Sequence, residues 1–229
     1  MALGRRHRLS IIVPVGPGDA LAPPLAATLR GLAAAAEIVV VTAGVDEAGP
    51  EPPAVFRPGW RNLAAGAGRA RQQNAGARAA GGDHLWFLHA DSRFGERTLA
   101  AAVAQIERGE LALAYFDLRF ADGPGLMRIN EWGAWLRSRW LGLPFGDQGF
   151  LMPRSLFEAL GGFDERLPAG EDHDLVWRAR AAAYRLRAMR VPLLTSARKY
   201  RQRGWLRTTV GHLQATIRQA LDFSVARSE

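Results

Sequence analysis

The chain of 229 residues carries 30 Lys and Arg residues against 22 Asp and Glu residues, and it has no cysteine. The absence of cysteine excludes disulfides, thiol catalysis, cysteine-ligated zinc and iron–sulfur clusters, and it suits a reducing, cytoplasmic location. With 48% hydrophobic residues the chain can build a substantial core, and we expect a single domain over residues 1–229. The formal net charge of +8 calls for an anionic partner, but charge alone does not choose among nucleic acid, a membrane surface and a phosphorylated small molecule.

Strand and helix patterns alternate in the first half of the chain. Short apolar runs predict strands at residues 9–13, 37–42, 54–57 and 85–88. Helical spacing of apolar residues predicts helices at residues 20–36, 68–80 and 98–107. This alternation predicts an α/β fold, a Rossmann-like three-layer sandwich whose mostly parallel central sheet is flanked by helices.

After residue 109 the pattern changes, and we expect strands at residues 111–120, 148–152 and 184–191 and helices at residues 126–141, 155–160 and 172–183. A last, basic amphipathic helix is expected at about residues 203–224. Such a helix either packs its apolar stripe on its own domain or lies on an anionic membrane surface. No apolar run reaches the roughly 18–20 residues that a membrane-spanning helix needs.

His89 and Asp91 follow the strand expected at residues 85–88 and are separated by one alanine. Ligands of open α/β sheets bind beyond the carboxyl ends of the strands, so an imidazole and a carboxylate here are placed to hold a metal ion or a diphosphate. Polar residues also end strands simply because the chain leaves the core. The pair by itself therefore leaves both interpretations open.

A glycine-led helix start at residues 66–76 carries Arg69 and Arg71 in its first turn. Unpaired amides at a helix N-terminus attract phosphate, and arginine can add bidentate contacts. Glycine before a helix is common, so this signal is weak when taken alone.

Two acidic segments complete the candidate chemistry. Residues 171–174 carry four ionisable side chains before a helix; Asp172 could be a general base for an attacking hydroxyl, or the acidic residues could serve only to cap the helix. Asp147 and Gln148 lie in a glycine-flanked turn, which could bind a hydroxylated acceptor or be an ordinary turn.

Taken in chain order, these segments resemble a family 2 glycosyltransferase of GT-A fold over about residues 9–200. The order of the motifs is far more specific than any one of them. The runs are most similar to the small bacterial branch known as arsenosugar-biosynthesis or radical-SAM/selenodomain-associated transferases. The matching segments are residues 10–15, 68–76, 87–92, 146–148, 157–163 and 171–172.

The resemblance implies a metal-dependent transfer, with inversion, of a sugar from a nucleotide diphosphate sugar to a hydroxyl acceptor. His89 and Asp91 would hold Mn²⁺ or Mg²⁺, and the imidazole favours Mn²⁺. Asp172, paired with Glu171, would be the base. The donor site would comprise Pro14, Thr42, Gly68, Arg69, Arg71, Asn74 and Asp91. The acceptor side would comprise Asp147, Gln148 and Trp132.

The same resemblance divides the domain into a nucleotide-binding half at about residues 8–108 and an acceptor and catalytic half at about residues 109–200. Two departures alter the expected nucleobase pocket: Thr42 stands where the family has an aspartate, and Gly16-Pro17 replaces an Asn-Glu pair. These departures keep open a degenerate, non-catalytic module that binds a nucleotide or serves as a scaffold. A nucleotidyltransferase would need a lysine-bearing phosphate loop that is missing here. RNA binding is suggested by charge alone, so we expect no nucleic-acid partner.

Overall fold

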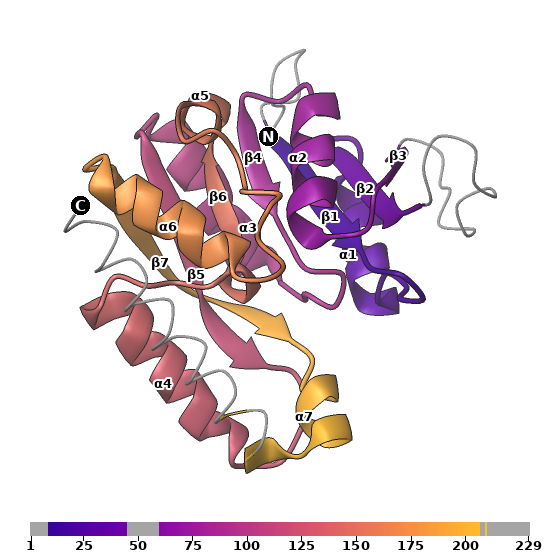
Figure 1. Cartoon of the computed structure of the whole chain (residues 1–229), viewed down its shortest axis with the longest axis vertical. Helices are drawn as coiled ribbons and strands as arrows, with labels where there is room; N and C mark the ends of the chain where they lie inside the picture. The colour runs from indigo at the N-terminus through magenta and orange to yellow at the C-terminus, as the bar shows by residue number, and fades with distance from the viewer. Residues whose placement is uncertain (1–8, 45–59, 207–208, 210–229) are drawn as a thin grey trace.

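The computed structural model describes residues 9–44, 60–206 and 209, and in this part of the chain a seven-stranded sheet of order β3-β2-β1-β4-β6-β5-β7 carries helices on both faces (Figure 1). The strands are β1 (Leu9–Val15), β2 (Glu37–Ala43), β3 (Trp60–Ala65), β4 (His84–Phe87), β5 (Ala112–Phe120), β6 (Phe150–Pro153) and β7 (Arg185–Thr195). The helices are α1 (Pro23–Leu32), α2 (Arg69–Ala79), α3 (Glu96–Glu107), α4 (Met127–Trp140), the 3₁₀ turn η1 (Gly146–Gln148), α5 (Arg154–Ala159), α6 (Glu171–Ala181) and α7 (Arg198–Arg203).

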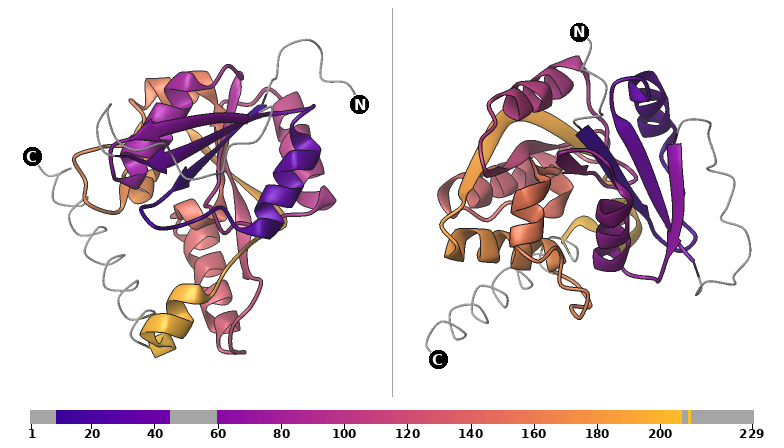
Figure 2. Two further views of the ribbon diagram at one scale, coloured as in Figure 1. Left: turned by 90° about the vertical axis from the view of Figure 1, so that its right-hand side faces the viewer. Right: turned by 90° about the horizontal axis from the view of Figure 1, so that it is seen from above.

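The sheet separates two hydrophobic layers, because its central strands are apolar on both faces. In β1, Leu9, Ile11 and Val13 pack in the layer beneath α1 and α3, whereas Ile12 packs in the opposite layer beneath α2, α5 and α6. Figure 2 shows these layers from above, with the sheet between them. The predicted three-layer α/β sandwich with a mostly parallel sheet is therefore confirmed.

One reversed strand brings distant segments to the same edge of the sheet. β1, β2 and β4 are parallel neighbours, but β6 runs antiparallel to β4 with Phe87 opposite Phe150. The residues that follow Phe87 therefore meet the residues that precede Phe150. They meet at the edge where β1 and β2 also end.

Some element boundaries differ from the sequence prediction. The strand expected at residues 54–57 lies outside the described residues, and the sheet takes its third strand from β3, which is only partly buried. Its polar and small side chains gave no strand signal, since β3 joins β2 through backbone pairing at the edge of the sheet. α1 begins at Pro23, because proline is favoured in the first turn of a helix and disfavoured further inside.

The helix expected at residues 203–224 falls for the most part outside the described residues. Among the residues that are described, no helix is both long and apolar enough to span a bilayer.

α2 approaches the sheet closely at Gly76. A Cβ added there would lie 2.5 Å from Ile12 Cγ2 and 3.0 Å from Val41 Cγ2. Contacts this short force neighbouring side chains to move, so glycine allows α2 to pack directly on β1 and β2. The N-terminus of α2 is thereby fixed above the edge where these two strands end.

We predict that Gly76→Ala lowers the free energy of unfolding by about 1–3 kcal/mol, because the added methyl group overpacks the contact between α2 and the sheet. Urea denaturation measures the loss. The matched control is Gly31→Ala in α1, where an added Cβ meets nothing within 4 Å. That variant should be neutral or gain up to about 1 kcal/mol from helix propensity. Equal stability of the two variants would contradict the close packing of α2.

Candidate active site

A cavity of about 600 Å³ lies at the edge where β1 and β4 end. Its walls come from the loop after β1, the N-terminus of α2, the turn after β4 and the residues that follow β7. The predicted site residues that line it are Pro14, Gly68, Arg69, His89 and Asp91. The structure thus brings together most of the expected metal and phosphate ligands.

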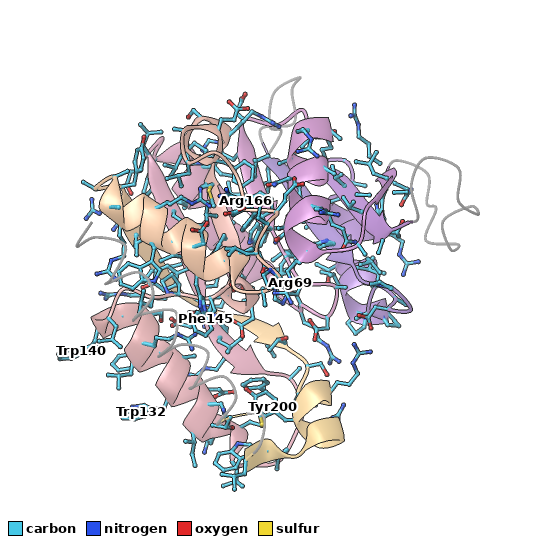
Figure 3. The ribbon with its side chains drawn as sticks, in the orientation of Figure 1. Arg69, Trp132, Trp140, Phe145, Arg166 and Tyr200 are labelled. Carbon is cyan, nitrogen blue, oxygen red and sulfur yellow. The ribbon has the colours of Figure 1, made fainter. Side chains whose placement is uncertain are left out.

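The N-terminus of α2 forms one wall of this cavity. Gly68 precedes the helix with a φ of 128°, a backbone conformation that favours glycine, and no side chain caps the first turn. The first amides of α2 have no partner within the helix, so they are available to an anion. Arg69 lies between α2 and α6 (Figure 3), with Nη1 3.3 Å from Glu171 Oε1.

Gln72 is a cavity residue that the sequence analysis missed. Its buried Nε2 donates to the carbonyl oxygens of Val15 and Val41, each at 2.7 Å, and so ties α2 to the ends of β1 and β2. The available signal was its place in the motif that begins at Gly68. A glutamine on a helix, however, is ordinarily exposed.

The turn after β4 and the start of α6 converge on Gly146. The Gly146 N–H donates to Asp172 Oδ2 at 2.6 Å. A Cβ added at Gly146 would lie 3.0 Å from Asp172 Oδ2 and 3.4 Å from His89 Nε2. His89 and Asp172, which are far apart in the chain, therefore lie against the same small residue.

The environment of Asp172 favours its charged form. Burial by itself raises the pKa of Asp172, but the charge of His173 and the hydrogen bond from Gly146 lower it. The charges of Arg69 and His89 act in the same direction, and the net effect holds the pKa of Asp172 below its usual value. Asp172 is therefore an ionised carboxylate near neutral pH.

Asp147, by contrast, is a half-buried residue whose buried Oδ1 accepts no hydrogen bond from the described residues. Burial raises the pKa of Asp147 to about 6, because the attraction of Arg137 offsets only part of the desolvation cost. The negative charge of Asp172 adds to this rise. Two neighbouring aspartates thus differ in protonation at mildly acidic pH, since Asp172 accepts N–H donors and Asp147 Oδ1 does not.

Arg137 and the rings of Phe145 and His173 pack together beside the turn that contains Gly146. The guanidinium carbon of Arg137 lies 3.1 Å from the centroid of the Phe145 ring, and the His173 ring centroid lies 3.6 Å from it. Arg137 Nε also donates to the Leu143 carbonyl oxygen at 2.9 Å. Burial lowers the pKa of Arg137 to about 10, which leaves it cationic at neutral pH. The sequence analysis missed Arg137, because only the packing of α4 makes it part of the site.

Two further arginines line the cavity and were not predicted. Arg198 Nη2 donates to Asp19 Oδ1 at 2.8 Å, and this hydrogen bond raises the pKa of Arg198. Arg93 has a buried Nε without a hydrogen-bond partner in the part of the chain that the structure describes. Together with Arg69, these cations outnumber the lining carboxylates Asp19 and Asp91. The cavity therefore suits an anionic ligand.

Three residues expected to bind the donor do not line this cavity. Thr42 is buried, and its hydroxyl donates to the Leu63 carbonyl oxygen at 3.2 Å. Asn74 Nδ2 donates to the Phe163 carbonyl oxygen at 2.8 Å, while its Oδ1 accepts the Phe163 N–H at 2.9 Å. Arg71 is exposed on α2 outside the cavity lining. Polar side chains of a motif can serve to stabilise the fold. Thr42 and Asn74 do so here, because each is hydrogen-bonded to the backbone of another segment.

The expected acceptor residues lie in three different environments. Gln148 is completely buried; its Nε2 donates to the Phe116 carbonyl oxygen at 2.9 Å, and its Oε1 accepts the Phe145 N–H at 3.1 Å. Both ends of this amide are therefore bound within the protein. Trp132 is 62% exposed on the outer face of α4, outside the cavity lining. Asp147 lies close enough to Asp172 and Asp91 for their negative charges to raise its pKa.

The cavity fits a metal ion that is bound partly by the substrate better than a metal ion that is bound by protein side chains alone. In the described ranges there is no group of three His, Asp or Glu side chains that could hold a metal ion. His89 and Asp91 both line the cavity and offer an imidazole nitrogen and carboxylate oxygens. A divalent cation that takes its other ligands from substrate phosphates and water needs only one or two protein ligands, so this pair fits such an ion.

The fold is shared with solved glycosyltransferase structures. The chain matches S. aureus TarS with a TM-score of 0.62 at 16% identity, over 82% of this chain and 36% of that chain. It matches the mannosyltransferase PcManGT from Pyrobaculum calidifontis, solved in complex with GDP-Man and Mn²⁺, with a TM-score of 0.60 at 19% identity, over 86% of this chain and 59% of that chain. It also matches residues 1–349 of S. aureus TarS in complex with UDP-GlcNAc, with a TM-score of 0.55 at 17% identity, over 82% of this chain and 58% of that chain.

No family model matches the chain, and neither does any curated protein. The chain spans less than two thirds of the length of these solved chains. At these identities the likeness establishes the fold, which is that of GT-A glycosyltransferases.

We predict that Asp147→Asn raises the free energy of unfolding at about pH 8 by about 1–2 kcal/mol, with little gain at about pH 4. The folded-state pKa of about 6 lies above the usual value of 3.8, so the folded protein keeps a proton that the unfolded chain releases in this window. Stability conferred by that proton is present below the usual pKa and is lost as the pH rises through about 6. Urea denaturation at the two pH values measures the difference.

The control for this prediction is Asp83→Asn, which removes an exposed carboxylate and should leave the stability unchanged at both pH values. A gain for Asp147→Asn that did not depend on pH would contradict the buried, proton-holding state of Asp147.

Proposed function

We propose that this protein transfers a sugar, with inversion, from a nucleotide diphosphate sugar to a hydroxyl acceptor. The observation that carries the proposal is the convergence of His89 and Asp172 on Gly146, next to a cavity lined by arginines. A GT-A fold supports the reaction class, and the motifs that resemble family 2 glycosyltransferases supply the roles. We further propose that the chain belongs to family 2, in the arsenosugar-biosynthesis and radical-SAM/selenodomain-associated branch.

The donor diphosphate is bound by the N-terminus of α2 and by the cavity arginines. The unpaired first amides of α2 and the positive end of its dipole attract phosphate oxygens. Arg69 is positioned by Glu171, which is buried and 3.3 Å away. Glu171 thus orients Arg69, and Arg93 and Arg198 add positive charge from the opposite segments of the cavity wall.

His89 and Asp91 would hold a divalent cation together with the diphosphate, and we propose Mn²⁺ or Mg²⁺. Such a cation, when bound, neutralises charge that develops on the leaving diphosphate. PcManGT, which has the same fold, was solved with GDP-Man and Mn²⁺, and this supports the assignment.

Asp172 acts as the general base. It is ionised, and the N–H groups of Gly146 and His173 bind one oxygen each and fix its orientation. Its remaining lone pairs can accept the proton of the acceptor hydroxyl as the hydroxyl oxygen forms a bond to the anomeric carbon. The bond from that carbon to the diphosphate oxygen breaks in the same step, and its electron pair leaves on the diphosphate.

One observation favours a second candidate, a non-catalytic GT-A module that binds nucleotides or serves as a scaffold. Thr42 stands at the end of β2 where the family has a base-reading carboxylate. Its hydroxyl is bound to the Leu63 carbonyl oxygen. Such a module would still use the α2 N-terminus for phosphates. It would not depend on Asp172. The cytoplasmic location and the membrane contact of the C-terminal helix stay predictions under either candidate.

We predict that Asp172→Asn lowers donor turnover by about 10²–10⁴-fold while nucleotide binding is retained, because the amide cannot take up the proton. Turnover is followed as release of UDP or GDP from UDP-GlcNAc and GDP-mannose, with water standing in for the acceptor. Binding of UDP and GDP is measured by calorimetry with and without Mn²⁺.

Two comparisons make this result interpretable. Asp91→Asn should weaken Mn²⁺-dependent nucleotide binding by about tenfold or more, since it removes a metal ligand. Asp83→Asn removes an exposed carboxylate and should behave like the wild type. Wild-type turnover by Asp172→Asn would refute the base assignment, and wild-type protein that binds both nucleotides without any effect of Mn²⁺ would favour the non-catalytic module.

A further inference from the structure

The outer face of α4 and the residues at its ends carry large apolar side chains that the fold leaves exposed. We call Leu126, Ile129, Trp132, Trp140 and Leu141 the α4 face; their exposed fractions are 49%, 53%, 62%, 75% and 58%. Figure 3 shows Trp132 and Trp140 pointing away from the body of the protein. Several such residues along one helix and at its ends indicate a binding surface, whereas single exposed apolar residues do not.

The α4 face is not needed to attach α4 to the domain. The opposite side of the helix, with Met127, Ala134 and Ser138, is buried. The Tyr115 hydroxyl donates to the Ser138 carbonyl oxygen at 2.8 Å, and Arg139 makes an ion pair with Asp117 at 2.7 Å. These contacts hold α4 on β5, so the exposed tryptophans contribute little to folding.

The surroundings of the α4 face are cationic. Arg128 is exposed one helical turn before Trp132, and Arg180 is exposed at the other end, where it donates to the Leu141 carbonyl oxygen at 3.0 Å. The only carboxylate within α4, Glu131, is turned inward and accepts hydrogen bonds from the Phe120 N–H and from Arg119. An apolar stripe between arginines is therefore presented to a partner.

We propose that the α4 face docks on an anionic membrane surface. Tryptophan is favoured at the boundary between lipid head groups and acyl chains because its ring is apolar and its N–H is polar, and arginines beside it attract anionic lipids. The net charge of +8 acts in the same direction. A second copy of this chain fits less well, since a two-fold contact would bring like-charged surroundings together. None of the residues of the α4 face lines the cavity proposed for sugar transfer.

The test measures binding of the full chain to vesicles in the absence of any substrate. The protein is sedimented with phosphatidylcholine vesicles that contain phosphatidylglycerol, and with vesicles of phosphatidylcholine alone. The wild type should bind the anionic vesicles, bind the neutral ones more weakly, and lose affinity as salt is added. The double variant Trp132→Ser, Trp140→Ser should bind the anionic vesicles about tenfold or more weakly.

The matched control is Leu111→Ser, which removes an apolar side chain that is 56% exposed but lies outside α4. It should bind like the wild type. Tryptophan emission should also shift to the blue on anionic vesicles for the wild type and for Leu111→Ser, and less so for the double variant. Thermal unfolding of all three proteins checks that they are folded.

Three results would overturn the proposal. One is equal binding of vesicles by the wild type and the double variant. The second is a concentration-dependent dimer, seen by sedimentation velocity, that the double variant loses while the wild type ignores vesicles; the face would then join two copies. The third is a marked loss of stability in the double variant with unchanged vesicle binding, which would show that the chain itself covers this face.

Discussion

The hydrogen bond from the Gly146 N–H to Asp172 Oδ2 depends on the direction of a single strand. Because β6 runs antiparallel to β4, the turn before β6 lies at the same edge as the turn after β4. A parallel β6 would place Gly146 at the opposite edge, far from His89. Asp172, the pair His89 and Asp91, and the N-terminus of α2 thus share one edge because one strand is reversed within a mostly parallel sheet.

The pKa values of Asp172 and Asp147 differ because the two carboxyl groups have different hydrogen-bond partners. Asp172 and Asp147 are both half-buried, yet only Asp172 receives backbone N–H donors at both oxygens, and its pKa is lowered while that of Asp147 is raised to about 6. The half-buried cation Arg137 lies near both. Stacking on Phe145 and attraction to these carboxylates offset only part of its desolvation cost, so its pKa stays lowered to about 10. The turn that donates to Asp172 is therefore held by the same cation that attracts the charge of Asp172.

α4 connects the interior of the site with the outer surface of the protein. Arg137 and Arg139 reach inward from this helix to Phe145 and Asp117, whereas Trp132 and Trp140 point outward. The packing of α4 on β5, which the sequence alone does not show, is what places Trp132 on the outer face of the helix.

The sequence by itself determined the α/β class and the central strands, because these depend on local periodicity. It also marked His89, Asp91 and Asp172 as candidate site residues, from the rule that ligands collect where strands end and from the order of the motifs. The tertiary structure decided which polar residues of the motifs face the cavity. Thr42, Asn74 and Gln148 are bound to backbone groups of other elements, whereas Gln72, Arg137 and Arg198 enter the site through packing. Side-chain direction depends on contacts between distant segments, and local spacing carries no information about those contacts.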